Sequence, residues 1–363
     1  MPRRVTRDWV LRRRLAAQRL SGSELRTGSD AVRLLVCVQA QDAPLTAHSV
    51  AMRTRSSTYD AVLDEQRAGG WVRTHILRPT WHFVAPEDLR WIQALTGPKV
   101  ESSLAARHRG LGLDTRRLSR ASEALSNLLA GGNALTRKEI QQHFARNGLP
   151  ASGEQIGHQL LVAEVRSVIC SGPPRGTEHT YQLVEDVVAH DKELDPDEAV
   201  RRLAQRFYAG HGPASERDLQ RWSGLTLTQI RAAIVDLGER LAAVECEGET
   251  LHFDPSVSAR TTRAQDAYLL STFDEAQLTY PATGFVRRGP DADRTRQVSE
   301  AGGGVVIAGL DDVGTFKRKV APKHVIVSVT ADVRLSSQER TAVHDAAERL
   351  AAFHQRELEL HWS

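Results

Sequence analysis

The sequence predicts an α+β protein, mainly α, with three tandem winged helix-turn-helix units and a small β-rich carboxy-terminal module with one packing helix. Two observations carry this prediction. Apolar residues at helical spacing are followed by short alternating strands twice in succession, which is typical of winged helices. A less regular version precedes them, and a strand-rich pattern follows. The expected domains are residues 1–119, 120–192, 193–258 and 259–363.

The third unit shows the pattern most clearly. Pro196 stands among three acidic residues, a composition that favours a helix start, and Gly210-His211-Gly212-Pro213 ends that helix. Leu219 and Trp222 mark a short second helix. A third helix has its apolar residues on one face, and residues 244–253 then alternate around Glu247-Gly248-Glu249, which predicts a β-hairpin.

The second unit repeats this order. Leu125, Leu128 and Leu129 form the apolar face of its first helix. Thr136 with Glu139, and Ser152 with Gln155, have the spacing of capping boxes and open the next two helices. The sequence then predicts strands over residues 167–170 and 180–183.

The first unit is read as an elaborated winged helix. It has expected helices at about 8–20, 30–41 and 59–67, strands at 71–74 and 80–84, and a further helix from Pro86. Asp30 is placed to cap the 30–41 helix, and Pro44 should end it near Gln41. In the carboxy-terminal module we expect strands near 304–308, 315–320 and 325–330, and a helix opened by Ser336.

Composition indicates a globular cytoplasmic protein, which we expect to be a monomer. Hydrophobic residues make up 40% and charged residues 26% of the 363 residues, and no apolar run has membrane-spanning length. The amino terminus lacks a secretory signal, and three widely spaced cysteines, Cys37, Cys170 and Cys246, suggest buried free thiols. The 48 basic residues comprise 42 arginines and 6 lysines, which suits phosphate binding, although a GC-rich genome would give the same bias.

Several catalytic classes are excluded. Gly302-Gly303-Gly304 lacks the spacing of a nucleotide-binding loop, and no nucleophile elbow is present. The 14 histidines and three cysteines have no metal-ligand spacing. We therefore expect neither a metal nor another cofactor.

Gln39-Ala40-Gln41 is the most informative motif. Residues i and i+2 of a helix point away from each other, so both amides could serve one site only if the backbone departs from a helix there. The alternative is that one glutamine is solvated and the other satisfies a helix end.

Three motifs together resemble the AlkZ-like family of alkylpurine DNA glycosylases, which are winged-helix proteins. The Gln-X-Gln hallmark is matched by Gln39-Ala40-Gln41, and an Arg-X-Thr-X-His strand by Arg78-Pro79-Thr80-Trp81-His82. The third signature stands as His211-Gly212-Pro213-Ala214 and Trp222-Ser223-Gly224-Leu225. The family's Leu-Pro-X-Phe-Asp-Glu-Tyr segment is matched in part by residues 270–276, without its proline, and Thr279-Tyr280 lacks the expected glycine.

This resemblance implies three winged helices and a small barrel-like part in a C-shaped body around a DNA channel. It implies hydrolysis of the N-glycosidic bond of N7-alkylated purines in double-stranded DNA, bulky adducts and interstrand crosslinks included. Gln39 and Gln41 would then be the catalytic residues, positioning a water and stabilising the sugar cation. Because no lysine lies near the motif, the reaction should lack a Schiff-base lyase step.

The remaining candidate residues are assigned to DNA or substrate binding. Arg78, Thr80 and His82 would line the pocket or hold DNA, and the alternative for His82 is a satisfied strand histidine. Asp42 would add electrostatic help, with helix capping or surface exposure as the alternative.

Three consecutive basic residues complete the candidate set. Lys317, Arg318 and Lys319, on an expected hairpin, would contact the DNA backbone or minor groove, and a solvated edge is the alternative. The competing function is a winged-helix DNA-binding protein or transcriptional regulator without catalysis.

Overall fold

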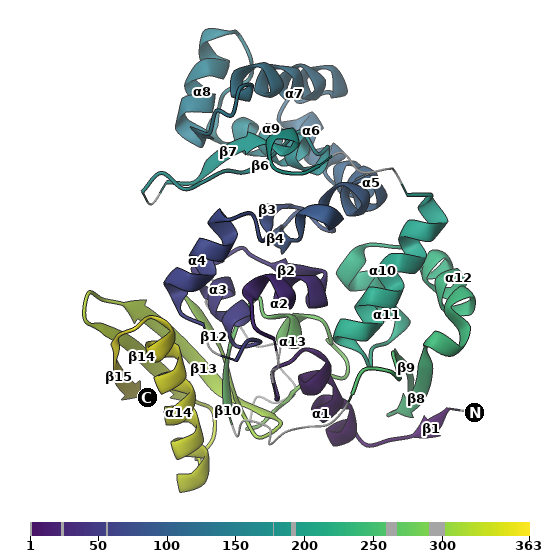
Figure 1. The fold of residues 1–363 in the computed structure, drawn as a ribbon, viewed down its shortest axis with the longest axis vertical. Helices are drawn as coiled ribbons and strands as arrows, with labels where there is room; N and C mark the ends of the chain where they lie inside the picture. Colours follow the sequence, from purple (N-terminus) through teal and green to yellow (C-terminus); the bar gives the residue numbers. More distant parts are fainter. Residues whose placement is uncertain are drawn as a thin grey trace.

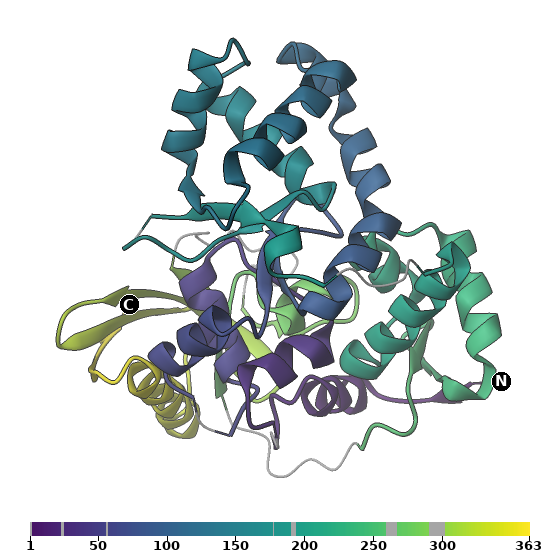
Figure 2. The same ribbon diagram turned by 45° about the horizontal axis from the view of Figure 1, so that its top comes forward.

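The computed structural model describes residues 2–22, 25–55, 57–176, 178–189, 194–258, 267–289 and 302–363. Figures 1 and 2 show residues 115–183 at the top and the carboxy-terminal helix at the bottom, with the strands of the first unit between them. The third unit lies on the right of both views. In the described ranges no helix combines the length and apolarity that a membrane crossing requires.

The first unit has a three-stranded sheet in the order β2-β4-β3, in which β4 pairs antiparallel with both neighbours. Its strands and surrounding helices are α2 (Gly28–Leu35), β2 (Cys37–Gln39), α3 (Ala43–Ala51), α4 (Tyr59–Arg67), β3 (Val72–His75), β4 (Trp81–Val84), α5 (Pro86–Ser103) and α6 (Ala105–Gly110).

The expected helix over residues 30–41 is wrong in its second half. Helix α2 ends at Leu35, and the next residue, Val36, has φ 67° and turns the chain into strand β2. Asp30 is also not the cap: the Thr27 side chain caps α2, and Asp30 completes the capping box from inside the helix. Gln39 therefore lies at the end of a strand, and Gln41 lies two residues beyond it in a bend.

The second unit matches the elements expected from its sequence. They are α7 (Thr115–Leu129), β5 (Leu135–Thr136), α8 (Arg137–Arg146), α9 (Gly153–Val165), β6 (Ile169–Ser171), β7 (Thr180–Leu183) and the short 3-10 helix η1 (Val184–Asp186). Both predicted capping boxes are present, at Thr136 and Ser152. The sheet order is β5-β7-β6.

The third unit contains the three expected helices and the hairpin. Its elements are α10 (Pro196–His211), α11 (Glu216–Ser223), α12 (Leu227–Leu237), the 3-10 helix η2 (Gly238–Arg240), β8 (Ala242–Cys246) and β9 (Glu249–Phe253). The amino terminus joins this unit, because β1 (Arg3–Arg4) pairs parallel with β8. Helix α1 (Arg7–Ala17) follows and contacts α10.

The carboxy-terminal module is one sheet, ordered β10-β12-β13-β14-β15, with β11 paired to β13. Its elements are β10 (Ala267–Ser271), α13 (Glu275–Leu278), β11 (Val286–Arg287), β12 (Gly303–Ala308), β13 (Asp311–Val320), β14 (His324–Ala331), α14 (Ser337–Phe353) and β15 (Glu357–Trp362). The predicted capping of α14 by Ser336 is confirmed. The β13–β14 hairpin reaches the left edge of the view in Figure 1.

The hydrophobic cores do not follow the expected domain boundaries. One core combines Leu35, Val38 and Phe83 of the first unit with Val327 and Leu350 of the carboxy-terminal module. A second joins the first unit to helices α10–α12. The expected boundary between 192 and 193 lies outside the described residues, and the one after 258 falls at the edge of such a segment.

Candidate active site

Gln39 is held where the first unit packs against the third. Helix α10 approaches the end of α2 so closely that a Cβ on Gly210 would lie 2.4 Å from the backbone oxygen of Leu34. Val36, in the following turn, is fully buried and has a positive φ that β-branched residues rarely adopt. Such strain persists only where packing imposes it and is common at functional sites.

The two glutamine amides contact the same segment of the second motif. Gln39 Oε1 accepts a hydrogen bond of 2.8 Å from Arg78 Nη2, and Gln41 Oε1 accepts one of 2.8 Å from the backbone N–H of Trp81. Both partners can only donate, so they fix the orientation of both amides. Gln39 is 7% exposed, whereas Gln41 lies on the surface.

A pocket of about 270 Å³ opens beside Gln39. It contains polar, cationic and apolar side chains from the first unit, the third unit and the carboxy-terminal module, namely Gln39, Arg78, Thr80, Arg221, Trp222, Phe273, Leu278 and Thr279. Gln41 and His82 are not among the lining residues. The pocket therefore collects parts of all four motifs of the sequence around one of the two glutamines.

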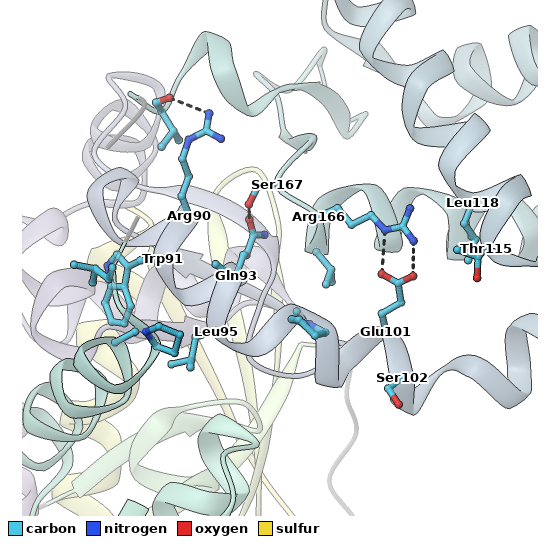
Figure 3. Close-up of a pocket in the computed structure, with 18 of the residues that line it drawn as sticks. Arg90, Trp91, Gln93, Leu95, Glu101, Ser102, Thr115, Leu118, Arg166 and Ser167 are labelled. Carbon is cyan, nitrogen blue, oxygen red and sulfur yellow. Dashed lines mark hydrogen bonds and ion pairs between the residues drawn. The ribbon is translucent and has the colours of Figure 1, made fainter. Parts of the chain in front are cut away.

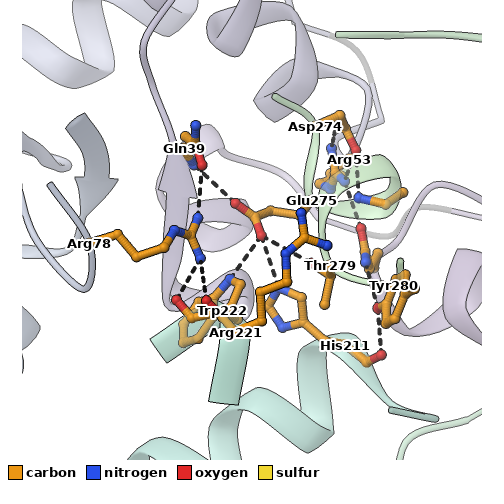
Figure 4. Close-up of polar contacts among 12 residues, drawn as sticks. Gln39, Arg53, Arg78, His211, Arg221, Trp222, Asp274, Glu275, Thr279 and Tyr280 are labelled. Carbon is orange, nitrogen blue, oxygen red and sulfur yellow. Dashed lines mark hydrogen bonds and ion pairs between the residues drawn. The ribbon is translucent and has the colours of Figure 1, made fainter. Parts of the chain in front are cut away.

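Arg78 links the first and third units. In addition to its bond to Gln39, its Nη1 donates to the backbone oxygen of Trp222 at 2.6 Å (Figure 4). Leu77, directly before Arg78, has φ 64°. A non-glycine residue with positive φ therefore precedes both Gln39 (Val36) and its partner Arg78 (Leu77). Arg78 thus braces Gln39 from a backbone held under local strain.

His82 is a neutral, buried histidine. Burial, with the nearby charge of Arg78, lowers the pKa of His82 to about 3. Its Nδ1–H donates to the Thr80 backbone oxygen at 2.9 Å, which leaves Nε2 with a lone pair and no hydrogen-bond partner among the described residues. Thr80 Oγ1 is likewise buried without such a partner. The strand-histidine alternative therefore accounts for one ring nitrogen only.

Glu275 is buried directly behind Gln39. Its Oε1 accepts from the Gln39 backbone N–H at 3.0 Å, and its Oε2 accepts from Trp222 Nε1 at 2.9 Å and from the Thr279 hydroxyl at 3.3 Å. His211 Nε2 lies 3.6 Å from Oε2. Burial raises the pKa of Glu275, but hydrogen bonding and charge from His211, with the Gln39 N–H and Arg78, outweigh it and keep the pKa below its ordinary value.

A second buried network supports this arrangement (Figure 4). Asp274 and Arg53 form a two-pronged ion pair, at 2.8 and 2.9 Å, with both side chains fully buried. Arg53 also donates to Gln18, Gln18 donates to the Tyr280 hydroxyl, and that hydroxyl donates to the backbone oxygen of His211. The network therefore connects Asp274, the chain neighbour of Glu275, to the backbone of His211, whose ring lies beside the Glu275 carboxylate.

Replacing Asp274 with asparagine should lower the free energy of unfolding by about 3–5 kcal/mol, because it breaks a fully buried, two-pronged ion pair with Arg53. Urea denaturation of the two proteins measures this difference. The double variant Arg53→Met, Asp274→Leu should be more stable than Asp274→Asn alone. Equal unfolding midpoints for wild type and Asp274→Asn would show that the ion pair contributes nothing.

The other predicted residues occupy two different settings. Asp42 caps α3 through Oδ1 at 3.1 Å from the Leu45 N–H, and its Oδ2 accepts from the Gly302 N–H at 2.9 Å. This agrees with the capping alternative. On β13, Lys317 and Lys319 are exposed, whereas Arg318 is half-buried with Nη1 3.4 Å from His354 Nε2.

A larger groove lies elsewhere. It has a volume of about 1660 Å³ and runs along α5, between the second and third units (Figure 3). Arg166 and Glu101 form an ion pair on its wall, and Gln93 accepts from Ser167 at 2.5 Å. None of the predicted site residues lines it. Across the described parts of the chain, no group of three or more potential metal-ligating side chains lies together.

Sequence reasoning missed the role of Glu275 and of the wall formed by Trp222 and Phe273. All three occur within quoted motifs, but no spacing rule connects Glu275 to Gln39, which lies 236 positions earlier. The one signal in the sequence was that Glu275 belongs to the motif over residues 270–276 and had no role assigned to it.

Comparison with known proteins identifies a family and a solved structure that are similar to this chain. A family model described as DNA glycosylase AlkZ-like matches residues 32–353. No curated protein sequence gives a significant match. Among solved structures, the DNA glycosylase AlkZ of Streptomyces sahachiroi is similar over 99% of this chain and 100% of its own, with a TM-score of 0.81 and 23% sequence identity. The two proteins share a fold.

Proposed function

The chain belongs to the AlkZ-like family of DNA glycosylases, and on this premise we propose that it hydrolyses the N-glycosidic bond of purines made cationic by N7 alkylation. The observation that carries the proposal is the Gln39 amide, which Arg78 orients at a pocket between three parts of the molecule, with Gln41 oriented by the Trp81 N–H just outside that pocket. The substrate of the protein would be double-stranded DNA, and the excised lesions would include bulky adducts and interstrand crosslinks.

The chemistry requires little of the protein. An N7-alkylated purine leaves as a neutral base, so acid catalysis is dispensable, and the sugar develops oxocarbenium character as the bond breaks. What remains is to hold a water close to C1′ in the right orientation. Two neutral amides meet this demand, and a normal purine is spared because its leaving group is poor.

The amide geometry supports a water-positioning role for Gln39 and Gln41. A carbonyl oxygen has two lone pairs, and Arg78 or the Trp81 N–H uses one on each glutamine. The second lone pair of each oxygen is then the acceptor for a proton of the attacking water. The carbonyl dipoles also stabilise positive charge on the sugar.

The same proposal assigns the remaining residues. Arg78, Thr80 and His82 hold the substrate pocket, and Lys317, Arg318 and Lys319 contact the DNA backbone or minor groove. Each of the three helical units is a winged helix, with the second beginning at the start of α7 rather than at the expected limit of 119/120, which falls inside that helix, and the protein acts as a cytoplasmic monomer. Asp42 keeps the capping role that its contacts support.

Phosphate contacts should make DNA binding strongly salt-dependent. The logarithm of the binding constant falls by about 0.9 per neutralised phosphate for each unit of log salt. Replacing Lys317, Arg318 and Lys319 by alanine should therefore lower the slope, and the exposed pair Lys317 and Lys319 should account for most of that decrease. Fluorescence anisotropy over a salt series measures it, and a flat response in wild type would argue against a DNA channel.

Base release separates this proposal from a regulator without catalysis. The purified protein should liberate free 7-methylguanine from alkylated plasmid DNA, detected by chromatography, above the spontaneous rate. A regulator would bind the plasmid and release no base.

A further inference from the structure

Glu275 and its neighbour Asp274 are both buried, but their charges are balanced differently. Asp274 meets the guanidinium of Arg53. Among the described residues, the partners of Glu275 are the Gln39 N–H, the Trp222 indole, the Thr279 hydroxyl and, at 3.6 Å, the His211 ring. None of these contacts is a two-pronged ion pair like that of Asp274, and the charge of Arg78 also helps to keep Glu275 anionic.

The residues that donate to Glu275 separate its carboxylate from the pocket beside Gln39. Gln39, Trp222 and Thr279, three of the four partner residues, line the pocket beside Gln39. Figure 4 shows the Glu275 carboxylate between Gln39 and the Trp222 and His211 side chains. Any positive charge that forms in the pocket therefore faces Glu275 across a single layer of protein.

We propose that Glu275 is a positioning residue: it fixes the backbone of Gln39 and places a permanent negative charge behind the pocket that stabilises positive charge on the sugar. This inference rests on the proposed function and deepens it, since it assigns the pocket a preference for a cationic sugar. Because the positive charge on the sugar develops only in the transition state, its attraction to Glu275 lowers the barrier rather than only binding substrate.

The preference can be measured without turnover. A pyrrolidine abasic nucleotide carries a positive charge near the C1′ position, whereas a tetrahydrofuran abasic nucleotide is neutral and similar in shape. Two charges several ångströms apart in a protein-like dielectric change affinity by about ten- to fiftyfold. Wild type should bind the pyrrolidine duplex more tightly than the tetrahydrofuran duplex by that factor.

Glu275→Gln should lose this preference while binding the neutral duplex as wild type does. A purely structural role for Glu275 would weaken both complexes equally. Asp88→Asn is the control, because Asp88 is also a buried carboxylate that accepts from an indole, Trp91 Nε1 at 3.0 Å, but it pairs with Arg206 and does not line the pocket. It should keep the preference. Thermal melting verifies that each variant is folded.

Two outcomes would overturn the inference: an undiminished preference in Glu275→Gln, or no preference in wild type. If Glu275→Gln does not fold, Glu275→Asp decides the question, since it retains the charge and must retain a preference of at least about tenfold. Failure of wild type to release 7-methylguanine would instead contradict the proposed function, so the two failures are distinguishable.

Discussion

Gln39→Ala and Gln41→Ala should each slow the release of 7-methylguanine by roughly a hundredfold, because loss of one anchor misplaces the attacking water. Gln39→Ala should have the larger effect, since Gln39 lines the pocket and Gln41 lies outside it. Affinity for undamaged DNA should change little in either variant. Single-turnover release from a single-lesion duplex measures the rate, and anisotropy measures the affinity.

Gln338→Ala provides the matched control, because Gln338 is an exposed glutamine on α14. Its release rate and DNA affinity should equal those of wild type. Unchanged turnover in both motif variants would remove Gln39 and Gln41 from the chemistry, and the pocket would then need a different water-holding group.

Selectivity should follow the charge of the leaving base. N7-methylguanine and N3-methyladenine are cationic and should be excised, whereas uracil, 8-oxoguanine and 1,N6-ethenoadenine should remain. If the positive charge supplies about 4 kcal/mol or more of the activation, the difference in rate is roughly a thousandfold or greater. A panel of single-lesion duplexes under single-turnover conditions measures it.

The reason for this expectation is the weakness of the proposed machinery. Two amides can position a water but cannot protonate a poor leaving group, and burial holds His82 neutral with a pKa of about 3. Efficient removal of uracil or 8-oxoguanine would demonstrate an acid or base stronger than the assigned residues. The proposed function also predicts that bulky N7 adducts are accepted, as they would be in an open DNA channel that does not enclose the base as the pockets of base-flipping enzymes do.

The second and third units were predictable because their signals are local. Capping boxes at Thr136 and Ser152, and the end of α10 at His211, each depend on a few adjacent residues. The turn at Val36 was not predictable. The apolar spacing before it is helical, and the tertiary packing that imposes its positive φ leaves no periodic signal in the sequence.

The candidate site was predictable only as separate motifs. Gln39 and Arg78 were both singled out, but their hydrogen bond depends on strand β2 replacing the expected helix. The pairing of β1 with β8 involves only Arg3 and Arg4 on the amino-terminal side, too few residues for a pattern. The role of Glu275 could be inferred only from its contact with the Gln39 N–H in the folded structure.

The most direct test of the central claim is the single-turnover rate at which wild type releases 7-methylguanine from a defined duplex in EDTA, compared with spontaneous depurination. The account predicts release well above the spontaneous rate, undiminished by the chelator, and close to that rate for the double variant Gln39→Ala, Gln41→Ala. Release by wild type no faster than spontaneous depurination, or equal release by the double variant, would contradict it.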